Sequence, residues 1–316
     1  MEARGVSAVR LDTDIHGARC LAQFAVRDDR AGVRLRVGEQ QLEGDQVTAI
    51  LYRHLHLHEA EHVEQPEARE LASSELRAAL EGGLLAIDCH WMNHPYANRL
   101  ARNKPLQLAL ASRLGFSLPE TSITDDPERI RGLYRSWRGE MVAKLVGGQV
   151  IASTPDDQYV VYTTPVTERD LDSAEALAAC PAIYQRRVEK AFDLRVTVVG
   201  ERVFACQIDS TADLEGSVDW RRAGVDSLPV RECSVDEGLA GKCLMLMRSL
   251  NLELAGLDFI VTPAGEAVFL EVNAAGQWLW VQQATGMPIA QAIAERLIAG
   301  SSESRSFTTP SAPTPA

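Results

Sequence analysis

The 316-residue chain has few of the features that mark secreted, membrane-spanning or nucleic-acid-binding proteins. Its six cysteines lie far apart without paired spacing, which predicts reduced, mostly buried thiols of a cytosolic protein. No apolar run approaches the length of a membrane span, and the N-terminus lacks the apolar core of a signal peptide. The formal net charge of −12 argues against nucleic acid as the main partner, because phosphate binding requires a basic surface. With 46% hydrophobic and 24% charged residues, the composition is that of a soluble enzyme with a sizeable core.

The N-terminal part of the chain, residues 1–97, predicts a small α/β domain. Short strands are expected at residues 6–11, 47–52 and 84–88, and a helix over residues 67–82. The chain exceeds a typical single domain in length, so further packed units should follow.

Two more units are expected, over residues 98–184 and 185–300. A helix with Pro105 in its first turn and Gly115 at its end opens the first of them. The other expected elements are strands at 140–145 and within 194–208, with a turn at Gly200, and a helix at 289–294. Residues 301–316 are low in complexity and are predicted to be disordered.

The most informative motif is a hairpin within residues 257–273, in which two alternating strands flank a turn that contains proline and glycine. If residues 263–266 form the loop, Thr262 pairs with Ala267. One face of the hairpin is then wholly apolar and is expected in the core: Leu257, Phe259, Val261, Val268, Leu270 and Val272.

On the polar face of this hairpin, the same counting sets Asp258 directly opposite Glu271. Asn273 follows Glu271 by two residues and therefore shares its face. Two carboxylates and an amide oxygen are ligands that suit Mg²⁺, which commonly bridges to nucleotide phosphates. The alternative is a pair of solvated carboxylates, but opposed like charges destabilise a sheet unless a cation or a proton separates them.

Two lysines are candidates for binding an anion. Lys144 ends an apolar strand before Gly147 and Gly148, whose backbone amides could approach phosphate oxygens; an edge-strand lysine facing water is the alternative. Lys104 opens a helix, where it either neutralises a phosphate beside the positive helix end or is exposed.

Between these elements, residues 183–190 lead into a strand that carries Asp193. Such a connection could offer a carbonyl and an amide to an adenine edge, with a carboxylate near the ribose hydroxyls. Taken alone, a linker between strands is the simpler interpretation.

In this order, the lysine strand, the Gln185 segment and the Asp…Glu-x-Asn hairpin resemble the motifs of ATP-grasp ligases. More narrowly, the chain resembles the graspetide (microviridin-type) peptide macrocyclases. The segments that carry this narrower resemblance are residues 98–108, 192–200, 270–280 and 284–286. The resemblance runs from Arg10 to about residue 298, and Gly276-Gln277-Trp278-Leu279-Trp280 is its most specific piece.

The resemblance implies an α/β (α+β) protein of the ATP-grasp fold, with an N-terminal α/β pre-ATP-grasp domain and two α+β subdomains that clasp ATP. It also implies roles for individual residues: Lys104 and Lys144 hold ATP phosphates; Gln185, Arg187 and Val188 frame the adenine, with Asp193 near the ribose; Asp258, Glu271 and Asn273 hold Mg²⁺; Arg195 and Arg221 face the reacting phosphate and the substrate carboxylate.

Three departures from the family pattern affect these expectations. Arg186-Arg187 stand where an acidic residue and an aromatic are usual, Ala274-Ala275 replace a frequent Pro-Asn, and Tyr52-Arg53-His54 replace the usual Tyr-Arg-Arg.

Two further features allow more than one interpretation. The histidines at positions 54, 56, 58 and 62 have a metal-like spacing, but no cysteine or carboxylate cluster completes a site, which favours a solvated strand and loop. Trp278 and Trp280 either stack on a peptide or belong to the core.

The expected activity is ATP-dependent macrocyclisation of a ribosomally made precursor peptide with a leader and an acidic, Thr/Ser-rich core. ATP would phosphorylate an Asp or Glu side chain, and a Ser, Thr or Lys side chain would then close an ω-ester or ω-amide ring. A RimK-like ligase that adds an amino acid is the first alternative. A non-catalytic nucleotide-dependent peptide-binding protein is the second, and the complete metal triad disfavours it. Neither nucleic acid nor membrane is expected as a partner, and a homodimer is left open.

Overall fold

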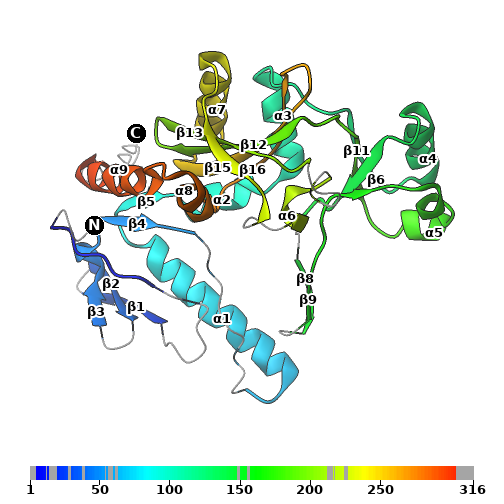
Figure 1. Cartoon of the computed structure of the whole chain (residues 1–316). Coiled ribbons are helices and arrows are strands. Elements are labelled where there is room, and N and C mark those ends of the chain that lie inside the picture. Colours follow the sequence, from blue (N-terminus) through cyan, green and yellow to red (C-terminus); the bar gives the residue numbers. More distant parts are fainter. Residues whose placement is uncertain are drawn as a thin grey trace, which may run out of the picture. The chain divides into compact units, whose positions relative to one another are not determined.

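The computed structural model divides the chain into two compact units, Met1–His94 with Ile293–Ala316, and Pro95–Ala292 (Figure 1). The structure describes residues 5–11, 13, 20–27, 30–37, 40–53, 55, 60, 63–147, 150–154, 157–211, 216, 218–223 and 227–303. Within this described part, no helix is both long and apolar enough to cross a lipid bilayer. The histidines at positions 54, 56, 58 and 62 lie outside it.

The first unit contains an antiparallel sheet covered by one long helix. Its elements are β1 (Cys20–Arg27), β2 (Arg30–Val37), β3 (Gln40–Glu43), η2 (Gly44–Gln46), β4 (Ala49–Leu51), α1 (Pro66–Leu85) and β5 (His90–Met92). Strands β1, β2 and β3 pair in sequence order, and β4 pairs with β5 in parallel. Leu80 and Leu84 of α1 pack with Val33 and Leu35 of β2, which builds the core of this unit.

Two sequence predictions in this unit are wrong. Residues 6–11 form no strand, and residues 84–88 are the end of α1 and the turn after it. The helix extends to Leu85 because Leu80, Gly83 and Leu84 recur at helical spacing and are all buried. A short apolar run of this kind reads equally well as a strand or as a buried helix segment.

The second unit contains two sheets and the helices that cover them. Its helices are α2 (Pro95–Ala101), α3 (Lys104–Arg113), α4 (Pro127–Ser136), η3 (Glu168–Leu171), α5 (Ala174–Leu177), α6 (Trp220–Ala223), α7 (Glu237–Ser249) and α8 (Leu279–Thr285); α9 (Ile289–Glu303) follows. The four-stranded sheet has the order β10 (Thr164–Pro165), β7 (Met141–Lys144), β11 (Ala182–Arg186), β6 (Thr121–Thr124). The five-stranded sheet has the order β14 (Val230–Cys233), β13 (Arg202–Ile208), β12 (Phe192–Val199), β15 (Leu254–Val261), β16 (Ala267–Asn273). A separate hairpin consists of β8 (Val150–Thr154) and β9 (Asp157–Val160).

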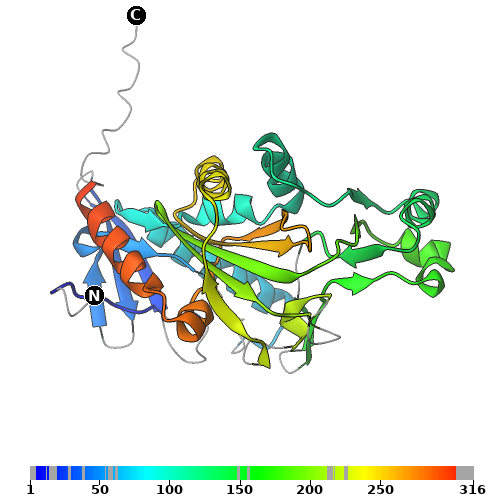
Figure 2. The same ribbon diagram turned by 45° about the horizontal axis from the view of Figure 1, so that its top comes forward.

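The largest core of this unit lies between the five-stranded sheet and α7, which Figure 2 shows against one face of that sheet. Leu246 and Met247 of α7 are buried there with Val196 of β12 and with Phe259 and Phe269 of the hairpin. The strands that carry the predicted metal ligands are therefore packed against this core.

Several predicted elements of the second unit are confirmed. Helix α3 has Pro105 in its first turn, its N-cap Asn103 accepts a hydrogen bond from the Leu106 amide, and Gly115 takes a left-handed φ of 73° after its end. Strand β7 lies within the expected range, and β12 and β13 turn at Gly200 as expected. The expected helix at 289–294 is confirmed as the start of α9, which continues into the first unit and extends to Glu303, three residues into the tail predicted to be disordered. The predicted boundary between residues 184 and 185 falls inside β11.

The hairpin confirms that Asp258 pairs with Glu271, although the count that led there is wrong near the turn. Ala267 pairs with Val261, not Thr262, and a bulge between Asp258 and Phe259 restores the register. Because of that bulge, Phe269 is the residue that enters the core.

The same bulge changes the position of Leu270, which was expected in the core. It is only partly buried and lines a pocket together with Glu271. The extra residue in β16 therefore exchanges the faces of two neighbouring apolar side chains.

Candidate functional site

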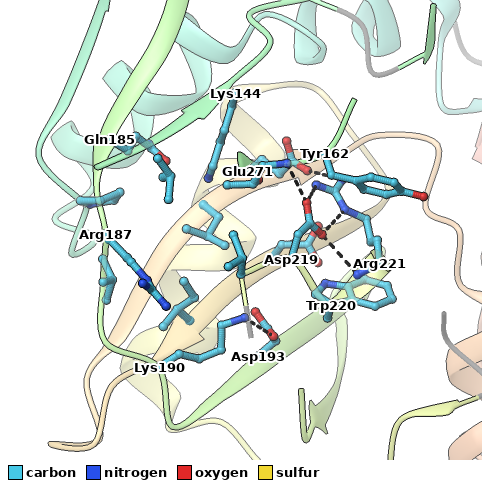
Figure 3. A pocket seen from close by; sticks show the side chains of 18 of the residues that line it. Lys144, Tyr162, Gln185, Arg187, Lys190, Asp193, Asp219, Trp220, Arg221 and Glu271 are labelled. Carbon is cyan, nitrogen blue, oxygen red and sulfur yellow. Dashed lines mark hydrogen bonds and ion pairs between the residues drawn. The ribbon is translucent and has the colours of Figure 1, made fainter. Parts of the chain in front are cut away.

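A pocket lies between the four-stranded and the five-stranded sheets of the second unit (Figure 3). Nine of the eleven predicted site residues line it: Lys104, Lys144, Gln185, Arg187, Val188, Asp193, Arg221, Asp258 and Glu271. Arg195 and Asn273 are not among the lining residues. Residues far apart in the sequence thus meet in one polar cavity.

Three cations surround Glu271 in the middle of this pocket. Lys104 Nζ lies 3.6 Å from Glu271 Oε2, and Arg221 Nη1 lies 3.4 Å from Glu271 Oε1. Lys104 also donates to the Leu145 carbonyl oxygen at 2.9 Å, which ties α3 to the end of β7. Burial lowers the pKa of the Lys144 ammonium to about 8, although the nearby charge of Glu271 opposes this change. Lys104, Lys144 and Arg221 therefore gather around the carboxylates of the pocket, and a cluster of cations of this kind suits a phosphate.

Arg221 is held in place by Asp219, a residue that the sequence analysis did not identify. Arg221 donates through Nε to Asp219 Oδ1 at 2.8 Å and through Nη2 to Oδ2 at 2.7 Å. The Thr163 amide also donates to Asp219 Oδ2, at 3.2 Å. Burial opposes ionisation of Asp219, but the hydrogen bonds and charge of Arg221 prevail and lower its pKa to about 2. This two-point pair fixes the guanidinium plane, so Nη1 points toward Glu271. An acidic residue two positions before the arginine was the available sequence signal.

Arg195 lies behind Asp258 and does not reach the pocket wall. It is 2% exposed, and its Nη1 donates to both carboxylate oxygens of Asp258 at 2.9 and 2.8 Å. Its Nη2 donates to the Gly276 carbonyl oxygen at 2.5 Å. Gly256 provides the room for this guanidinium, because a Cβ there would lie 2.0 Å from Arg195 Cζ. The geometry gives Arg195 a supporting position for Asp258; its expected contact with the reacting phosphate stays a prediction.

The paired carboxylates fit a hard divalent cation. Burial raises the pKa of Asp258, while Arg195 opposes this change and the charge of Glu271 adds to it. A divalent cation between the two carboxylates would relieve that repulsion and supply charge for phosphate oxygens. Asn273 stands two pairs further along the hairpin, opposite Gly256, and its Oδ1 accepts from the Ala275 amide at 3.1 Å. Among the described residues, no group of three His, Cys, Asp or Glu side chains forms a metal site, so Asp258 and Glu271 would need Asn273 or phosphate oxygens to complete the shell.

At another part of the pocket, Gln185 and Arg187 lie on the same wall as Lys144 (Figure 3). Gln185 is 3% exposed, and its Nε2 donates to Thr121 Oγ1 at 3.0 Å. The two unusual arginines of this segment both line the pocket, and the exposed Arg186 also pairs with Glu120 at 2.9 Å. Either arginine can therefore affect a ligand in the cavity.

Asp193 is engaged in a buried network at the far end of the pocket. Lys190 Nζ lies 2.8 Å from Asp193 Oδ2, and the Ser210 hydroxyl donates to the same oxygen. Burial raises the pKa of Asp193, while Lys190 opposes this change. The expected ribose contact stays a prediction, and Lys190 and Ser210 are partners that the sequence analysis missed.

Neither of the tryptophans expected to stack on a peptide or to enter the core lines the pocket itself. The rings of Trp280 and Trp220 lie 5.1 Å apart at 42°, and Trp220 lines the pocket beside Arg221. Trp278 is partly buried. The specific Trp-containing run is thus linked to the pocket through α6.

Comparisons with known proteins agree with this arrangement. A family model described as the MvdD pre-ATP grasp domain matches residues 1–99. The chain resembles a probable alpha-L-glutamate ligase from Shewanella loihica, with 30% identity over 208 residues. That match covers 65% of this chain and 65% of the relative's own length.

Two solved structures resemble nearly the whole chain. One is a Chryseobacterium gregarium RiPP-associated ATP-grasp ligase in complex with ADP and a leader and core peptide, with a TM-score of 0.86, 27% identity, and coverage of 94% of this chain and 90% of that one. The other is the macrocyclase MdnC from Microcystis aeruginosa bound with the precursor peptide MdnA, with a TM-score of 0.82, 28% identity, and coverage of 94% and 92%. The expected ATP-grasp fold with a pre-ATP-grasp domain is confirmed, and so is the expected resemblance to graspetide (microviridin-type) maturases.

Proposed function

We propose that this protein is an ATP-dependent ligase that macrocyclises a ribosomally made precursor peptide. The observation that carries the proposal is the pocket in which Lys104, Lys144 and Arg221 surround an opposed pair of carboxylates. The solved relatives add support, because they match both the pocket-bearing unit and the N-terminal unit and include proteins bound to leader, core or precursor peptides. A cytoplasmic enzyme, an acidic Thr/Ser-rich core peptide and a homodimer are further parts of the proposal.

In this proposal, the lysines and Arg221 hold ATP and the transferring phosphoryl group. Asp258 and Glu271, with Asn273, would hold Mg²⁺, which supplies positive charge to phosphate oxygens when it is bound. Gln185, Arg187 and Val188 would frame the adenine, and Asp193 would lie near the ribose. Catalysis then comes from positioning and from neutralising charge, since phosphoryl transfer needs no covalent nucleophile on the protein.

The reaction proceeds in two steps on the peptide. An Asp or Glu carboxylate of the core takes the γ-phosphoryl group of ATP, which gives an acyl phosphate and ADP. A Ser or Thr hydroxyl or a Lys amine of the same peptide attacks the acyl carbon, loses its proton, and expels phosphate. The peptide gains an ω-ester or ω-amide ring and loses one water for each link. Arg221, which Asp219 holds beside Glu271, would neutralise the acyl phosphate.

A ligase that adds a free amino acid is the second candidate. The identity to glutamate ligases favours it, yet that match spans only 65% of those relatives' length. The match of residues 1–99 to the MvdD pre-ATP grasp domain favours macrocyclisation.

Intact mass separates these candidates. We expect co-expression with a short acidic, Thr/Ser-rich precursor peptide to yield a peptide that has lost one water for each link. Mild base should open ester links and leave amide links intact. A peptide heavier by an amino-acid residue would move the assignment to the second candidate. An unchanged mass with ATP still bound would indicate a non-catalytic protein.

The pKa of Lys144 leads to a prediction about nucleotide binding and pH. At pH 9 the ammonium, whose pKa is about 8 in the free protein, has largely lost its proton. Phosphate charge favours the ammonium, so binding an ATP analogue at pH 9 should take up close to one proton, whereas at pH 6.5 Lys144 should take up none. Calorimetry in two buffers of different ionisation enthalpy measures this uptake at pH 9, where the ATP phosphates are fully ionised.

The matched variant is Lys144→Ala. It should abolish the proton uptake and weaken binding by about 1.5–3 kcal/mol, the range for hydrogen bonds to charged groups. Unchanged affinity and unchanged uptake would place Lys144 outside the phosphate site.

A further inference from the structure

Thr121 and Gln185 stand opposite each other in the antiparallel pairing of β6 with β11. Directly opposed residues send their side chains to the same face of a sheet, so both leave it on one side. Gln185 is buried on the wall of the pocket, next to Lys144 and Arg187 (Figure 3). Its Nε2 lies 3.0 Å from Thr121 Oγ1, which in turn lies 2.7 Å from the Pro119 carbonyl oxygen.

The direction of this short chain of hydrogen bonds follows from the groups themselves. The Pro119 carbonyl oxygen can only accept, so it takes the single hydroxyl proton of Thr121. Thr121 Oγ1 can then only accept from Gln185, and a carboxamide donates only through its nitrogen. The two ends of the Gln185 carboxamide are thereby distinguished, and its oxygen must point away from Thr121.

Glu120, which lies between Pro119 and Thr121, is itself held by hydrogen bonds. The Arg186 amide donates to the Glu120 carbonyl oxygen at 2.9 Å. The Glu120 carboxylate accepts from Arg186 Nη1 at 2.9 Å and from Trp137 Nε1 at 3.1 Å. These contacts join Glu120 to Arg186. Because Glu120 precedes Thr121 and Arg186 follows Gln185, the hydrogen bonds between Thr121 and Gln185 have little freedom to rearrange.

Within the part of the chain that the structure describes, no residue donates a hydrogen bond to the Gln185 amide oxygen. This oxygen is not among the fully buried polar atoms that lack a partner, so it is accessible at the pocket wall, where a ligand can supply a donor. Adenine carries an amine donor at C6, whereas a 6-oxo purine carries an acceptor there. If the Gln185 amide oxygen faces C6 of the base, it therefore attracts adenine and repels a 6-oxo purine.

We infer that Thr121 is a positioning residue for nucleobase choice: through its hydroxyl it turns the Gln185 amide oxygen into the pocket, which favours a 6-amino purine over a 6-oxo purine. The inference rests on the proposed use of ATP and adds a residue that acts through Gln185 without touching the nucleotide.

The first test uses the unmodified protein and three nucleotides with the same ribose and phosphates. ATP carries the 6-amino group, purine riboside triphosphate carries hydrogen at C6, and inosine triphosphate carries oxygen. Competition binding should rank them in that order. Removing the donor should weaken binding about fivefold, as for the loss of one hydrogen bond, and opposing two acceptors should weaken it further. Equal binding of ATP and inosine triphosphate would overturn the inference.

The second test removes the hydrogen bond that orients the Gln185 carboxamide. Thr121→Val keeps the β-branched shape but removes the hydroxyl, so the Gln185 carboxamide can turn and present its nitrogen. The ATP preference over inosine triphosphate should fall about tenfold, as ATP loses a good acceptor and the 6-oxo base gains a donor. Thr121→Ser restores a hydroxyl and should restore the preference. Ser122→Ala is the matched control, since the neighbouring residue of β6 faces the opposite side of the sheet.

The outcomes separate this inference from the proposed function. A Thr121→Val protein that binds ATP with the unmodified preference contradicts the inference alone. Should that variant not fold, the nucleotide series on the unmodified protein decides the matter. A Thr121-dependent adenine preference without any change in peptide mass would support the inference and contradict the ligase activity. Failure of every nucleotide to bind would contradict both.

Discussion

Glu271→Gln is expected to reduce ADP formation by at least about a hundredfold, since even residues that merely support metal ligands cost 10–100-fold when replaced. The substitution keeps the side-chain shape but removes one of the two charges that face each other across the hairpin. Asp258→Asn should have a similar effect for the same reason. The measurement is peptide-dependent ADP release at saturating Mg²⁺.

A second measurement on Glu271→Gln separates loss of the metal site from loss of structure. Glu271 is the counter-charge between Lys104 and Arg221, so its neutralisation leaves those cations free to attract phosphate. Without Mg²⁺, the variant should bind ATP at least as tightly as the unmodified protein. Glu232→Gln, an exposed change on β14 of the same sheet, is the control and should leave turnover unchanged. Normal turnover by Glu271→Gln would show that this hairpin does not hold the metal ion.

Gly256→Ala is expected to destabilise the protein by about 3 kcal/mol, in the range for overpacking combined with disruption of a buried ion pair. A Cβ at this position would lie 2.0 Å from both Cζ and Nη2 of Arg195. The guanidinium cannot move without giving up Asp258 and the Gly276 carbonyl, its two hydrogen-bond partners. Urea denaturation should show a lower midpoint with an unchanged slope.

The control for this substitution is Gly241→Ala in α7. No heavy atom outside the glycine's own helical surroundings lies within 4 Å of a Cβ built there, so the added methyl should stabilise the helix by about 0.5–1 kcal/mol. If Gly256→Ala lowers the free energy of unfolding and Gly241→Ala raises it, the loss at Gly256 is due to the contact with Arg195. Equal stability of Gly256→Ala and the unmodified protein would mean that Arg195 does not hold Asp258 in this way.

Local pattern was sufficient for part of the site. Strand alternation and a short turn predicted that Asp258 opposes Glu271, and the pairing is confirmed because a hairpin closes over a few residues and limits the possible registers. The same holds for α3, whose proline, N-cap and terminal glycine are all encoded within a dozen residues. The bulge that exchanges Phe269 and Leu270 was not predictable in this way, since it is selected by packing of Phe269 against Phe116 and Phe259.

The sequence by itself indicated the resemblance to ATP-grasp ligases, the opposed carboxylates and the residue types that can bind a nucleotide phosphate. Tertiary structure alone decided which polar group each of them contacts. Arg195 meets Asp258 across 63 residues of chain, and Gln185 meets Thr121 across 64. Such pairs are set by how strands align in a sheet, and no local spacing encodes that alignment. For this reason Arg195 reads from sequence as a phosphate ligand and lies in the structure as the support of a carboxylate.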